Sequence, residues 1–204
     1  MNTNHHLLNF KRQLIAALAA IFFSAVPVTS VSAFEAVLTN ERSGNVIHVD
    51  QNGSTTQVIP ICNRPRGMVR GPAETQVTIA CSDDHKLVIY NRTTRTIDSE
   101  ILAVPGAMNV ALHVASKRLF VTNEGNARAS VFDLPSGQLI AELPTGLEPD
   151  GIVITDDGKN IFVASENAGL VHVFDGATYE PKEVIRTNLR PRRIALSKDE
   201  LWVS

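Results

Sequence analysis

The stretch Leu119–Asp133, LFVTNEGNARASVFD, consists of two short alternating apolar runs on either side of a polar turn. Related stretches occur at 36–50 (AVLTNERSGNVIHVD), 78–91 (TIACSDDHKLVIYN) and 161–175 (IFVASENAGLVHVFD). The polar residues that end these runs lie 41, 42 and 42 residues apart in the chain: Asp50, Asn91, Asp133 and Asp175. Alternating apolar residues predict half-buried β-strands, and a fixed period of about 40 residues is typical of β-propeller blades.

The repeats divide the chain from residue 34 onward into units of four antiparallel strands, which predicts an all-β chain folded as a β-propeller. We place the units at about 34–62, 63–104, 105–146, 147–188 and 189–204, the last one incomplete. The innermost strands are expected at 67–70, 109–114, 151–155 and 193–197, and the first unit lacks one.

An open series of blades leaves strand edges unpaired, and propellers avoid this by closing into a ring. We therefore expect these residues to be an amino-terminal fragment of a longer propeller, with about seven blades in the full-length protein. A complete four-bladed ring is the alternative interpretation.

The first 33 residues have the features of a secretory signal peptide. Lys11 and Arg12 precede an apolar run over 14–26, and residues 31–33 (VSA) offer the small side chains that a signal peptidase recognises. The run is shorter than the roughly 20 apolar residues of a membrane helix. We expect cleavage after Ala33 and export of the chain, with the periplasm as its destination, the alternative being an uncleaved membrane anchor.

The mature chain, residues 34–204, contains 17 Lys and Arg against 21 Asp and Glu, a net charge of −4. This charge argues against broad attraction to nucleic acid. The two cysteines, Cys62 and Cys81, are too few for a multi-cysteine metal site. In an oxidising compartment they are candidates for one disulfide, the alternative being two core thiols. The histidines show no zinc-binding spacing, so no metal site is predicted.

The repeats resemble the YVTN family of β-propeller proteins. The resemblance rests on PDGI at 149–152, on FVTN at 120–123 and on VHVFD at 171–175. An exported chain with TNE at 122–124 and VFD at 131–133 also resembles the periplasmic propellers associated with bacterial alcohol oxidation dependent on pyrroloquinoline quinone (PQQ). That resemblance implies a quinoprotein context, and PQQ or haem association follows from it alone, because no repeat residue indicates cofactor binding.

Carboxylates recur after the second strand of each unit, 41 or 42 residues apart: Glu41, Asp83, Glu124 and Glu166. Their regular recurrence favours a structural role, in which each carboxylate accepts backbone N–H groups within its own turn. A metal or substrate site is the alternative.

A second series, near the start of each innermost strand, holds different residue types at 42-residue intervals: Arg66, Met108, Asp150 and Arg192. These residues are expected at the mouth of the central channel. Guanidinium and carboxylate groups together suit an anionic or polar ligand, bound by charge-assisted hydrogen bonds. Asn109 and Arg193 are the neighbouring candidates, and divergent solvated loop residues are the alternative interpretation.

The function favoured by the sequence is that of a non-enzymatic binding or scaffold protein. Its channel-mouth face would receive a partner protein or a small polar ligand. The alternative is an enzyme-related propeller, either a lactonase-like hydrolase or a redox subunit that holds quinone or d1 haem. No nucleophile elbow, P-loop or dinucleotide fingerprint is present, so no catalytic residue is predicted.

Overall fold

The computed structural model describes residues 35–102, 104–187, 190–198 and 200–204. The expected signal peptide at 1–33 lies outside the described residues. Among the residues that are described, no helix is both long and apolar enough to cross a membrane. The described regular structure is almost entirely β, with a single 3-10 helix, η1 (Glu124–Asn126).

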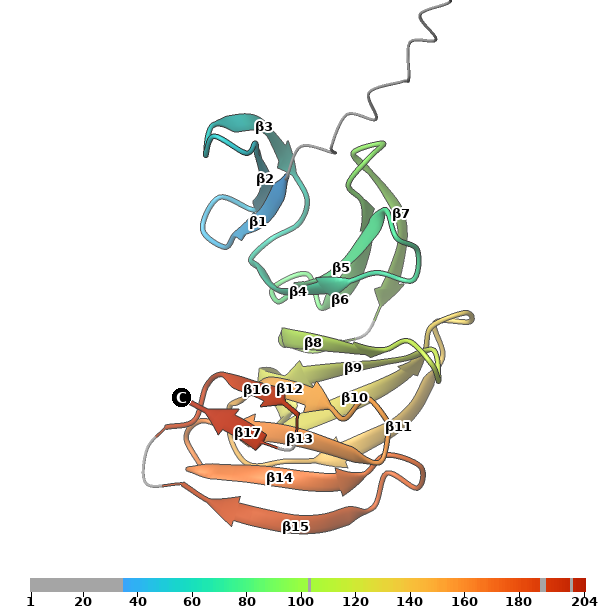
Figure 1. Cartoon of the computed structure of the whole chain (residues 1–204), viewed down its shortest axis with the longest axis vertical. Helices are drawn as coiled ribbons and strands as arrows, with labels where there is room; N and C mark the ends of the chain where they lie inside the picture. Colours follow the sequence, from blue (N-terminus) through green and yellow to red (C-terminus); the bar gives the residue numbers. More distant parts are fainter. Residues whose placement is uncertain (1–34, 103, 188–189, 199) are drawn as a thin grey trace, which may run out of the picture. The chain divides into compact units, whose positions relative to one another are not determined.

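The strands form five successive antiparallel sheets, which are blades of a β-propeller (Figure 1). Blade 1 has three strands: β1 (Ala36–Asn40), β2 (Asn45–Val49) and β3 (Thr55–Pro60). Blade 2 has four: β4 (Pro65–Arg70), β5 (Gln76–Cys81), β6 (Lys86–Asn91) and β7 (Thr96–Leu102). Blade 3 also has four: β8 (Ala107–His113), β9 (Arg118–Asn123), β10 (Arg128–Asp133) and β11 (Leu139–Pro144).

Blade 4 consists of β12 (Pro149–Ile154), β13 (Asn160–Ser165), β14 (Leu170–Asp175) and β15 (Pro181–Arg186). Blade 5 has two described strands, β16 (Ile194–Ser197) and β17 (Glu200–Val203). Within each blade the strands pair in chain order, and the described residues include no innermost strand for the first blade. The predicted all-β propeller fold is confirmed.

The hydrophobic core lies between successive blades. Leu87 of blade 2 belongs to the same buried cluster as Leu119 and Phe132 of blade 3. Phe120 of blade 3 and Phe174 of blade 4 likewise share a cluster. The middle strands are therefore buried on both faces, which explains their nearly continuous apolar runs. The outermost strands have one neighbour only, and every residue of β15 is exposed.

Cys62 and Cys81 form a disulfide with a Cα–Cα distance of 5.9 Å. The bond joins the segment after β3 to the last residue of β5, and so links blade 1 to blade 2. It closes a loop with a sequence separation of 19. Constraining a loop of this length in the unfolded chain stabilises the fold by about 3 kcal/mol.

His172 fixes the connection between blades 3 and 4. Its Nε2 accepts a hydrogen bond of 2.9 Å from the backbone N–H of Gly146, which lies after β11. Only the neutral imidazole offers this acceptor. Burial lowers the pKa of His172 below its usual value of 6.5, because the charged form loses hydration. The histidine has a structural role in this contact.

The pH dependence of unfolding tests this role. Because the pKa of His172 is lower in the folded chain than in the unfolded one, the unfolded chain binds the proton more readily. The free energy of unfolding should be highest above pH 6.5 and should fall as the pH drops from there toward 5. His172→Gln retains an acceptor oxygen without titrating, so urea unfolding should show a flatter profile. An unchanged profile would show that His172 does not carry this linkage.

Candidate functional site at the start of the innermost strands

Each complete innermost strand contains a bulge near its start. The pairing of β4 with β5 shifts, so that Arg66 and Gly67 lie opposite the single residue Ala80. The same shift occurs in the next two blades, where it involves Met108-Asn109 opposite Thr122 and Asp150-Gly151 opposite Ala164. A bulge of this kind interrupts the ladder and redirects a side chain.

The innermost strands β4, β8 and β12 therefore begin two residues earlier than expected. The residues before each bulge, Pro65, Ala107 and Pro149, still pair with the neighbouring strand. The alternation of apolar residues is broken at the bulge, so the sequence pattern placed the strand start at the second bulge residue. Blade 5 shows a similar arrangement, because the N–H groups of Arg192 and Arg193 both donate to the Ser204 carbonyl, at 2.7 and 3.1 Å.

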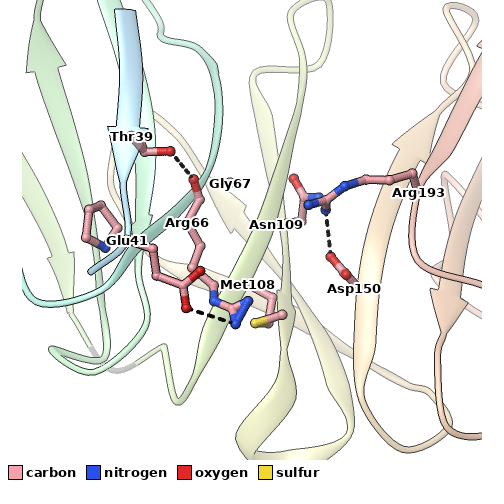
Figure 2. Close-up of a pocket in the computed structure, with 9 residues that line it drawn as sticks. Thr39, Glu41, Arg66, Gly67, Met108, Asn109, Asp150 and Arg193 are labelled. Atoms are coloured by element: carbon pink, nitrogen blue, oxygen red, sulfur yellow. Dashed lines mark hydrogen bonds and ion pairs between the residues drawn. The ribbon is translucent and has the colours of Figure 1, made fainter. Parts of the chain in front are cut away.

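The bulge residues of blades 2 to 4 meet at a pocket of about 320 Å³ (Figure 2). β1 and the residue before β16 complete it. The lining residues are Thr39, Glu41, Pro65, Arg66, Gly67, Met108, Asn109, Asp150 and Arg193. Most of these side chains are polar, and two guanidinium groups and two carboxylates are among them. We call this the channel-mouth pocket.

Arg66 forms one side of the channel-mouth pocket. Its guanidinium pairs with Glu41 of the turn after β1, with 3.2 Å between Nη2 and Oε1. Thr39 donates a hydrogen bond of 2.8 Å to the Arg66 carbonyl, which anchors the bulge to β1. Arg66 Nε is buried, and no acceptor for its N–H exists among the described residues. A buried donor without a partner is costly and calls for an acceptor.

Asp150 and Arg193 form the opposite side of the channel-mouth pocket. Arg193 Nη1 donates to Asp150 Oδ1 at 3.0 Å. The Asp150 side chain is 10% exposed and that of Arg193 is 71% exposed. The Asp150 carbonyl accepts a hydrogen bond of 2.7 Å from the Thr122 hydroxyl, which holds β12 against blade 3. Figure 2 shows the contact between Arg193 and Asp150, with Asn109 drawn beside the end of the Arg193 side chain.

Met108 and Asn109 lie between the two charged pairs. Met108 is 8% exposed and supplies an apolar wall. Asn109 Oδ1 accepts from the N–H of Val110 at 3.0 Å. A side chain at Gly67 would place its Cβ 2.6 Å from Asn109 Oδ1, so glycine permits β4 and β8 to approach closely.

Arg192, which the sequence placed at the channel mouth, does not line this pocket. Its Nη2 lies 2.7 Å from Oε1 of Glu166, whose side chain is 7% exposed, and Arg190 contacts the same oxygen. The proximity of Glu166 raises the pKa of Arg192. Two successive residues before β16 point to different partners, and Arg193 rather than Arg192 enters the channel-mouth pocket.

The recurring carboxylates differ from their expected role in the turns. Glu41 pairs with Arg64 at 3.0 Å as well as with Arg66, and Asp83 pairs with Arg64 at 3.4 Å. No backbone N–H among the described residues donates to Glu41, Asp83 or Glu166 side chains. They serve as counter-ions for arginines instead. For these three carboxylates the interpretation as turn acceptors is wrong, because the nearby guanidinium groups offer stronger, charge-assisted contacts. For Glu124 it stays a prediction.

No group of three or more His, Cys, Asp or Glu side chains that could hold a metal ion occurs within the described ranges. His48, which is fully buried, lies between Glu35 at 2.7 Å and the Tyr90 hydroxyl at 2.8 Å. Those contacts account for its polar atoms.

Comparisons with known proteins support the fold. Neither the protein-family models nor the curated proteins gave a match. Among solved structures, the hydrazine synthase of Kuenenia stuttgartiensis aligns with a TM-score of 0.61 and 25% identity, over 66% of this chain and 39% of that one. A functionally unknown protein from Desulfotomaculum acetoxidans DSM 771 aligns with a TM-score of 0.69 and 16% identity, over 82% of this chain and 58% of that one. The chain therefore spans about two fifths and three fifths of these structures.

Double-mutant cycles test which arginine faces Asp150. Since the pair of Asp150 and Arg193 is partly exposed, Asp150→Asn and Arg193→Ala should show a coupling energy of about 0.5–1 kcal/mol in urea unfolding. The cycle of Asp150→Asn with Arg192→Ala should give a smaller coupling, because Arg192 pairs with Glu166. A stronger coupling to Arg192 than to Arg193 would contradict the assignment.

Proposed function

We propose that this chain belongs to an exported, non-enzymatic binding propeller whose channel-mouth pocket receives a small ligand with an anionic group. The observation that carries the proposal is the presence of two guanidinium groups, those of Arg66 and Arg193, in the lining of one polar pocket. A carboxylate or phosphate oxygen of a ligand would accept charge-assisted hydrogen bonds from the accessible N–H groups of these two side chains.

The two guanidinium groups suit such a ligand. Arg66 contacts Glu41 through Nη2, and Arg193 contacts Asp150 through Nη1. Each guanidinium carries five N–H donors, so further donors are left for a bound anion. The carboxylates hold the guanidinium groups in place before binding, which lowers the entropy cost of association. Their charges also balance, so a single anionic group is favoured over a highly charged ligand.

The biological context of the proposal rests on the resemblance to YVTN propellers linked to PQQ-dependent alcohol oxidation. In that context the protein acts in the periplasm beside a quinoprotein, after removal of residues 1–33. The polar pocket is compatible with a carboxylate-bearing metabolite of such a pathway, and with the carboxylates of PQQ itself.

An enzyme-related propeller is the second candidate. The observation that favours it is the similarity to hydrazine synthase, at 25% identity over 66% of this chain. Such a protein would be a lactonase-like hydrolase or a redox subunit that holds quinone or d1 haem. Turnover of a lactone, or an absorption spectrum retained after reconstitution with quinone or d1 haem, would favour this candidate over the binding protein.

Calorimetric titration of the full chain with succinate, inorganic phosphate and PQQ tests the first proposal. At least one of these probes should bind, and Arg66→Ala combined with Arg193→Ala should weaken that binding at least about tenfold, because each arginine donates charge-assisted hydrogen bonds. Arg128→Ala is the matched control, since Arg128 is a partly exposed arginine paired with Glu142 outside the pocket. Absence of binding by all three probes, or equal affinity of the double variant and the control, would refute the proposal.

A further inference from the structure

A second pocket, of about 420 Å³, lies between blades 2 and 3 and has a mainly apolar lining. Its residues come from the turns after β4, β8 and β10 and from strands β5, β6, β7 and β8. They are Pro72, Gln76, Ile89, Ser99, Leu112, Val114, Lys117, Leu134 and Pro135. We call it the blade 2–3 groove. None of these residues lines the channel-mouth pocket, so the two sites are separate.

The next blade pair shows why this groove is open. His113 follows Leu112 on β8 and bridges blades 3 and 4, with its Nε2 3.1 Å from the Asp156 carbonyl. The equivalent position in blade 2 is Gly71, which directly follows β4 and donates its N–H to the Gln76 carbonyl. Gly71 has no side chain to bridge blades 2 and 3. A Cβ there would lie 2.6 Å from the Gln76 Cβ, so local packing excludes one.

The charge at the groove also differs from that of the next blade. Among the residues that line the groove, Lys117 alone carries an ionisable side chain. Within the described ranges, no carboxylate or other acceptor contacts its ammonium group. The equivalent residue in blade 4, Lys159, pairs with Asp157 at 2.9 Å. The position of Asp157 is occupied in blade 3 by Ala115. Lys117 is therefore a cation without a counter-ion beside an apolar groove.

The apolar part of the groove is continuous with the core. Leu112 and Leu134 pack against the buried cluster shared by blades 2 and 3, and Ile89 is 5% exposed. Val114 at the rim is 74% exposed. Covering this surface with an apolar body removes it from water, which favours binding. A pocket of this volume is within the range of small-molecule sites.

We propose that the blade 2–3 groove binds a small amphiphile with an apolar body and one carboxylate. The body lies on Leu112, Val114 and Leu134, and the carboxylate pairs with the Lys117 ammonium. The Ser99 hydroxyl, which has no hydrogen-bond partner among the described residues, lies on the other wall of the groove. This site is independent of the proposed ligand of the channel-mouth pocket.

Titration of the full chain with decanoate, and with decan-1-ol as the uncharged match, tests the proposal. Decanoate should bind below its micelle-forming concentration and at least tenfold more tightly than decan-1-ol. Lys117→Glu should weaken decanoate binding at least tenfold and leave decan-1-ol binding within twofold. Ser99→Trp fills the groove from an exposed position and should weaken both ligands.

Lys159→Glu is the matched control, because Lys159 occupies the same turn position one blade later. It should leave decanoate affinity unchanged, as should the combined Arg66→Ala and Arg193→Ala variant of the channel-mouth pocket. Equal effects of Lys117→Glu and Lys159→Glu, no effect of Ser99→Trp, or loss of decanoate binding in the Arg66 and Arg193 variant would each overturn the proposal. Circular dichroism of each variant establishes that it is folded before titration.

Discussion

The bulge near the start of each innermost strand is the constraint on which the channel-mouth pocket depends. Two residues face one across the ladder in blades 2, 3 and 4, and the first of each pair is Arg66, Met108 or Asp150. A regular ladder would alternate these side chains between the two faces of the blade. The bulge redirects them, and equivalent positions in neighbouring blades therefore meet in one pocket.

Much of the fold follows from the sequence because the period of the apolar runs is nearly constant. The same period found the bulge positions, since Arg66, Met108 and Asp150 are 42 residues apart. The bulges themselves were not predicted. The two residues at each bulge interrupt the alternation of apolar side chains, and their types differ from blade to blade, so they form no recognisable sequence pattern. The repeat pattern also does not predict whether Arg192 or Arg193 lines the pocket. That depends on which carboxylate each side chain reaches.

The carboxylates show how one repeat position can have a different arginine partner in each blade. Glu41 precedes Arg66 by 25 residues and Glu166 precedes Arg192 by 26, and both pairs form ion contacts. Where the bulge residue is Met108, the preceding Asp83 pairs with Arg64 instead. This spacing between an acid and the next bulge arginine was present in the sequence.

Arginine Nε resonances offer the most direct measurement of the central claim, that the bulge holds the Arg66 guanidinium, with its buried Nε–H donor, in the lining of the channel-mouth pocket. In a ¹⁵N-labelled full chain, one slowly exchanging arginine Nε–H signal should disappear in Arg66→Lys and should shift when succinate or phosphate is added. The Arg128 signal should stay in place. If the Arg66 Nε–H exchanges as fast as that of Arg128, or does not respond to either anion, the donor is not held as the structure describes and the account is wrong.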